Sequence, residues 1–80
     1  MPVVLRTQGF AFGFYANDHA PPHVHVIYAG TRCRILLETL AVTHGSMKQN
    51  DQTRAVQLVA ANRETLERAW TAFQLRRMGL

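Results

Sequence analysis

The sequence has too few cysteines for a disulfide-rich protein and no hydrophobic run long enough for a membrane span. Its single cysteine, Cys33, excludes an internal disulfide framework and a zinc site built from several cysteines. Cys33 falls on the apolar face of an alternating run, which predicts a buried and unreactive thiol. No long apolar run or signal peptide is visible, so we expect a cytoplasmic protein that does not associate with membranes. A chain of 80 residues is expected to form one domain, residues 1–80, with a small core.

What the sequence does have is a basic surplus carried almost wholly by arginine. Nine basic residues against five acidic ones leave a formal net charge of +4, and Lys48 is the only lysine. Arginine is the planar, bidentate residue suited to phosphate, so RNA or DNA is the polyanion expected as a partner. The arginines are spread along the chain without interleaved aromatic residues, which leaves solubility as an alternative purpose of this charge.

The hydrophobic pattern changes its period near the middle of the chain. From about residue 3 to residue 43 it alternates, and phenylalanines facing the core mark a strand at residues 10–15. From about residue 50 to residue 77 the apolar residues recur at helical spacing: Ala55, Val59, Leu66, Trp70 and Phe73. We therefore predict an α+β fold, a four-stranded antiparallel β-meander packed against one long or two short C-terminal α-helices. A break is expected near Asn62, which could cap a second helix.

Three of the four histidines lie close together in the sequence, at His19, His23 and His25. The segment DHAPPHVHV at residues 18–26 contains two prolines, which stiffen a turn just before a strand. Strand alternation places His23 and His25 on the same face of the sheet. The turn is expected to fold His19 back toward the head of that strand.

Such a cluster suits two kinds of chemistry. As catalytic residues, the three histidines would exchange protons near neutral pH, with Asp18 orienting an imidazole and Arg32 or Arg34 binding phosphate. That arrangement would cleave RNA without a metal. As metal ligands, the same three histidines would bind zinc or another divalent cation, leaving a position for water; otherwise no cofactor is expected. A third interpretation is that the histidines only pack and cap the turn.

Two segments resemble a family of short bacterial proteins known as a domain of unknown function. Residues 9–26, GFAFGFYANDHAPPHVHV, are similar to its aromatic strand followed by the signature N-D-H-x-P-P-H-x-H-V. Residues 62–70, NRETLERAW, are similar to its closing helix, whereas residues 42–52 have little to match. The resemblance implies a component of a toxin–antitoxin-like gene pair, with a small protein partner from the same operon. It also implies that the three clustered histidines are functional positions supported by Asp18, without assigning their roles.

These observations leave three hypotheses for the function. In the first, the chain belongs to a toxin–antitoxin-like module and acts on or binds nucleic acid through the histidine cluster. In the second, it is a non-enzymatic protein-binding module whose histidines are structural. In the third, it is a small divalent-metal-binding protein. The sequence does not decide whether the chain is an enzyme, and a homodimer is compatible with all three because a short chain gains core area by pairing.

Overall fold

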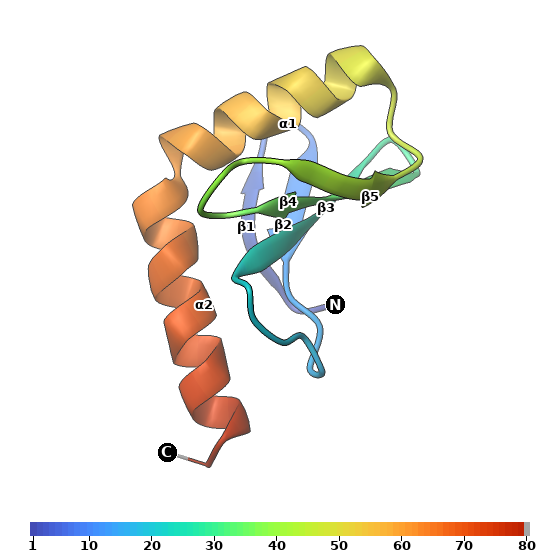
Figure 1. The fold of residues 1–80 in the computed structure, drawn as a ribbon. Helices are drawn as coiled ribbons and strands as arrows, with labels where there is room; N and C mark the ends of the chain where they lie inside the picture. The colour runs from blue at the N-terminus through green and yellow to red at the C-terminus, as the bar shows by residue number, and fades with distance from the viewer. Residues whose placement is uncertain (80) are drawn as a thin grey trace.

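The computed structural model describes residues 1–79 as five strands followed by two helices (Figure 1). The elements are β1 (Val3–Thr7), β2 (Phe10–Gly13), β3 (His23–Tyr28), β4 (Thr31–Leu36), β5 (Val42–Gly45), α1 (Gln49–Ala61) and α2 (Arg63–Arg77). Each strand pairs antiparallel with the next one along the chain, which gives a meander in the order β1-β2-β3-β4-β5. The predicted α+β class and meander topology are confirmed, with two separate helices.

The prediction of four strands was wrong, because β5 lies in a segment whose hydrophobic pattern is ambiguous. Three of its four residues are exposed, so no alternation of buried and exposed positions marks it. It is held instead by its pairing with β4, where Arg34 lies opposite His44 and Ile35 lies opposite Val42. A strand defined by backbone pairing more than by buried side chains leaves little trace in a hydrophobicity pattern.

Two tight turns set the register within the β1–β2 hairpin and within the β3–β4 hairpin. Gln8 and Gly9 join β1 to β2 with φ angles of 51° and 85°. Ala29 and Gly30 join β3 to β4 with φ angles of 49° and 77°. Two consecutive positive φ angles are typical of the hairpin turns that match the twist of paired strands, and glycine adopts them without steric cost.

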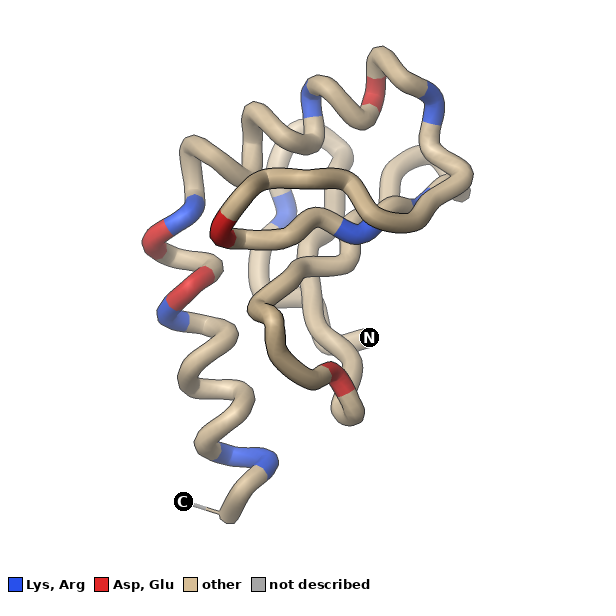
Figure 2. The backbone as a smooth tube through the Cα atoms, viewed as in Figure 1, with Lys and Arg blue, Asp and Glu red and all other residues tan. Residues whose placement is uncertain are grey.

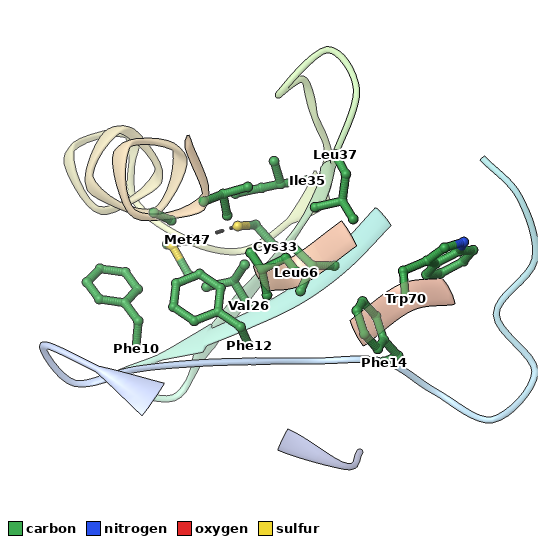
Figure 3. Close-up of a cluster of buried hydrophobic side chains, with 13 residues drawn as sticks. Phe10, Phe12, Phe14, Val26, Cys33, Ile35, Leu37, Met47, Leu66 and Trp70 are labelled. Carbon is green, nitrogen blue, oxygen red and sulfur yellow. Dashed lines mark hydrogen bonds between the residues drawn. The ribbon is translucent and has the colours of Figure 1, made fainter. Parts of the chain in front are cut away.

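One face of the sheet packs against the helices and forms a single core (Figure 3). The buried apolar side chains come from β2, β3 and β4 or their ends and from both helices: Phe10, Phe12, Phe14, Val24, Val26, Cys33, Ile35, Leu37, Ala55, Val59, Leu66 and Trp70. The phenylalanines face the core as predicted. Met47, just before α1, brings its sulfur to 3.9 Å from the sulfur of Cys33. We call the other face of the sheet, opposite this core, the outer face.

The helical segment breaks at Asn62, as predicted, but this residue does not cap α2. Its side-chain amide donates to the carbonyl of Leu58 at 2.8 Å, and no side-chain hydrogen bond caps the start of α2. The side chain of Arg63 instead donates to the carbonyls of Leu37 and Glu38 at 2.9 and 2.8 Å, which fastens the start of α2 to the end of the β4 segment. Among residues 1–79, neither helix is both long and apolar enough to cross a membrane.

Candidate functional site

The strand pairing brings histidines and an arginine onto the outer face. His25 of β3 pairs with Arg34 of β4, and Arg34 pairs with His44 of β5. Directly paired residues point to the same side of a sheet, so these three residues form a row across three strands. His23 and His25 also share this face, as predicted, because the valines between and after them point into the core. Their ring centroids lie 5.2 Å apart.

The loop between β2 and β3 carries Asp18 to the head of β3. The backbone N–H of Tyr15 donates to Asp18 Oδ2 at 2.8 Å, which orients the carboxylate. Helix α2 holds the same loop, because the side chains of Gln74 and Arg77 donate to the backbone carbonyl of Asp18 at 3.2 and 2.6 Å. The Asp18 side chain is 10% exposed; Tyr15 orients its carboxylate, and α2 holds its backbone.

Asp18, His23 and His25 form a compact group that we call the Asp18 cluster. His25 Nε2 lies 3.1 Å from Asp18 Oδ2 and 3.2 Å from Oδ1. His23 Nε2 lies 3.3 Å from Oδ1. The donor atoms of the three residues all lie within 4.8 Å of one another. Two imidazoles therefore share one carboxylate at short range.

The pKa shifts in this cluster have opposing causes. Burial alone would raise the pKa of the Asp18 carboxyl, but the Tyr15 N–H and His25 outweigh it and hold the pKa below the ordinary 3.8. Burial lowers the pKa of His25 below its ordinary 6.5, and the hydrogen bond to Asp18 offsets this only in part. At neutral pH Asp18 is therefore ionised and His25 is neutral, so the Nε2–H of His25 donates to the carboxylate.

His23 is the buried member of the cluster. The residue is 5% exposed, and its ring centroid lies 5.2 Å from that of Trp70 on α2. Its Nδ1 lies 2.8 Å from the carbonyl oxygen of Pro21, and a carbonyl can only accept, so Nδ1 carries a proton. Nε2 is therefore the nitrogen that faces the rest of the cluster.

The structure does not bring His19 to the other two clustered histidines. Its side chain is exposed, and its Nδ1 lies 3.1 Å from an Arg77 guanidinium nitrogen at the end of α2. Within residues 1–79, the group able to hold a metal is Asp18 with His23 and His25, so the carboxylate occupies the place that the sequence pattern suggested for His19. The turn reverses the chain as expected, but it brings Asp18, and not His19, next to β3.

A second feature of the outer face is a surface hollow of about 350 Å³ beside His25. We call it the arginine hollow, after Arg32 and Arg34, which line it together with His25 and His44. The two predicted phosphate-binding arginines thus lie next to a clustered histidine. Within residues 1–79, neither arginine forms an ion pair with a carboxylate. Figure 2 shows how few acidic residues the chain sets against its basic ones.

Two residues of this region were not singled out in the sequence. His44 reaches the hollow only because β5 pairs with β4. Tyr15 packs its ring edge-on against His25, with centroids 4.5 Å apart, and its hydroxyl accepts from Arg32 Nη1 at 3.4 Å. The alternation of residues 10–15 places Tyr15 on the side opposite the phenylalanines, so the sequence pattern could have indicated it as an outer-face residue.

Comparisons with known proteins define the family of this chain. Searches of curated proteins and of solved structures gave no significant match. The sequence profile of a family described as Domain of unknown function (DUF4160) matches residues 9–71. The matched segment includes the Asp18 cluster and every residue named above for the arginine hollow. The chain belongs to the Domain of unknown function (DUF4160) family.

Proposed function

We propose that the chain binds nucleic acid, RNA in the first instance, through phosphate groups held in the arginine hollow. The observation that supports this is the pair of guanidinium groups, Arg32 and Arg34, which line one hollow and have no carboxylate partner in residues 1–79. Arg32 Nη1 donates to the Tyr15 hydroxyl and Arg34 Nε donates to the Thr43 hydroxyl, but no carboxylate neutralises either charge. Each guanidinium therefore keeps its full charge and its remaining N–H donors for phosphate. Membership of a toxin–antitoxin-like module is part of the proposal, and it rests on the sequence resemblance.

The register of the sheet concentrates positive charge on this face. Arg6 pairs with Ala11, Ala11 with Ile27, and Ile27 with Arg32, so Arg6 and Arg32 point to the same side. Arg34 is two residues from Arg32 on β4 and shares that side. All three arginines of the sheet therefore lie opposite the core. A charge that is diffuse along the sequence becomes one-sided in the sheet, which favours a polyanionic partner.

Binding is better supported than cleavage by a pair of histidines. An acid–base pair must reach the substrate from two sides. His25 lines the arginine hollow, but His23 does not; it is 5% exposed and packs against Trp70. The proposal therefore assigns phosphate binding to the hollow and assigns no metal-free cleavage step to the cluster.

The binding proposal is tested with fluorescein-labelled single-stranded RNA and fluorescence anisotropy in buffer containing EDTA. The double variant Arg32→Gln, Arg34→Gln should bind RNA at least about tenfold more weakly than the wild type. The slope of log K against log salt should also fall by about 1.4, the value for two phosphate contacts on a single strand. The matched control is Arg68→Gln, Arg76→Gln, which removes the same charge from α2 and should change binding about twofold or less.

Equal losses in the two double variants would refute the arginine hollow as the binding site, since only the net charge would then matter. Absence of RNA binding by the wild type would refute the nucleic-acid function and would favour the protein-binding module. In bacteria, expression of the chain alone should slow growth, and Arg32→Gln, Arg34→Gln should relieve that effect if the module acts through nucleic acid.

A further inference from the structure

A buried nitrogen in the Asp18 cluster has no hydrogen-bond partner. His23 Nε2 is fully shielded from solvent, and nothing in residues 1–79 forms a hydrogen bond with it. Asp18 Oδ1 is 3.3 Å away but forms no hydrogen bond with it. Because Nδ1 carries the proton that Pro21 accepts, Nε2 is the ring nitrogen that can offer a lone pair to the cluster. A buried lone pair beside a carboxylate is costly unless a cation lies between them.

The spacing of the donor atoms is close to that of a metal site. With zinc–ligand bonds of about 2.0–2.1 Å, neighbouring ligand atoms of a tetrahedral site are about 3.3 Å apart. Asp18 Oδ1 lies 3.3 Å from His23 Nε2 and 3.2 Å from His25 Nε2. The two imidazole nitrogens lie within 4.8 Å of each other and would need to approach by no more than about 1.5 Å.

The surroundings of the cluster are also those of a metal site. Histidine ligands commonly donate their second ring N–H to a backbone carbonyl, as His23 does to Pro21. Ligating carboxylates are commonly oriented by hydrogen bonds, as Asp18 is by the Tyr15 N–H. The His25 side chain is 21% exposed and lines the arginine hollow, which provides a path for an ion from solvent.

We propose that Asp18, His23 and His25 bind one divalent cation of the zinc type. Two imidazole nitrogens and one carboxylate oxygen suit zinc or a similar transition metal rather than calcium or magnesium, which prefer oxygen ligands. For His25 to bind through Nε2, the ring proton that Nε2 donates to Asp18 in the metal-free chain moves to Nδ1, which leaves Nε2 with a lone pair. Three protein ligands leave at least one position for water or a phosphate oxygen. The role of this cation rests on the proposed function: held at His25, it would add positive charge next to a phosphate bound in the arginine hollow.

The test is zinc binding without nucleic acid, on protein stripped with EDTA and dialysed. Isothermal titration with Zn²⁺ should give one ion per chain for the wild type. His25→Ala should lower the affinity at least about 100-fold, and Asp18→Asn should also lower it while keeping an acceptor for Tyr15. The matched control is His19→Ala, which removes a neighbouring exposed histidine and should leave the affinity unchanged. Far-UV circular dichroism verifies that each variant is folded, and Zn²⁺ should raise Tm only where it binds.

The inference is overturned if the folded wild type takes up no zinc, or if His19→Ala weakens binding as much as His25→Ala does. Because RNA binding is measured in EDTA with arginine variants, the two proposals fail separately. Loss of zinc binding alone refutes the metal site, and loss of RNA binding alone refutes the arginine hollow.

Discussion

Asp18 connects β3, which follows it directly in the sequence, with residues of α2 that are 56 and 59 positions away. Its carboxylate faces both histidines of β3, and its backbone carbonyl accepts from Gln74 and Arg77 of α2. The sequence identified Asp18 only as a support for a histidine. Its central position depends on how the loop reverses before β3 and on how α2 holds it, and both are tertiary effects.

Cys33 gives a prediction at the residue scale. It is 3% exposed, and burial raises the pKa of its thiol from 9.0 to about 11. Between these pH values the unfolded chain releases the thiol proton and the folded chain retains it. The free energy of unfolding should therefore fall as pH rises through this window, by about 2–3 kcal/mol. Urea unfolding at about pH 8 and about pH 11 measures this loss.

The control for the Cys33 prediction is Cys33→Ala, because tyrosine and lysine also titrate at high pH. The difference in unfolding free energy between wild type and variant should shrink from the lower pH to the higher one. A difference that stays constant would mean that the buried thiol does not control this part of the pH dependence.

At the scale of elements, the junction between α1 and α2 is anchored by one side chain. Arg63 donates to two carbonyls at the end of the β4 segment, those of Leu37 and Glu38. Arg63→Ala should lower the free energy of unfolding by about 1.5–3 kcal/mol, since hydrogen bonds to a charged group are lost and acceptors are left unpaired. Urea denaturation followed by far-UV circular dichroism measures the change.

Arg68→Ala on the same helix is the matched comparison for Arg63→Ala. Arg68 pairs with Glu64 four residues earlier, and both side chains are largely exposed, so the change should stay within about 0.5 kcal/mol. Equal losses at the two positions would show that Arg63 acts through helix propensity and not through its contacts with the sheet.

At the scale of the whole molecule, the sheet and both helices share one core. Trp70, the only tryptophan, lies 5.5 Å from Phe14 and 5.2 Å from His23, measured between ring centroids. Its fluorescence therefore reports the packing of α2 on the sheet. We expect fluorescence and far-UV circular dichroism to give the same urea midpoint, as for a single domain that unfolds in one step. A fluorescence transition at lower urea would show that α2 leaves the sheet before the helices unfold.

The class of the fold, the order of its first four strands and most of its core could be predicted from the sequence. Met47 was not predicted for the core, and Phe73, which was, is only partly buried. The phenylalanine alternation and the helical spacing of Val59, Leu66 and Trp70 were sufficient, because these patterns follow from which side chains leave water. The break at Asn62 was also predicted, although its hydrogen bond closes α1 and does not cap α2. These features could be predicted because local propensity and the pattern of buried residues can be recognised within a single segment of the sequence.

Which polar residues meet could not be predicted from the sequence, because it depends on contacts between distant segments. β5 was missed because strand pairing holds it, and His44 reaches Arg34 only through that pairing. The sequence suggested His19 as the third member of the cluster, whereas the folded loop places Asp18 there and leaves His19 beside Arg77. A hydrophobic pattern records burial, but it does not record which way a loop turns or which strands lie side by side. The geometry of polar side chains depends on those long-range contacts, and so the site could be read only from the folded chain.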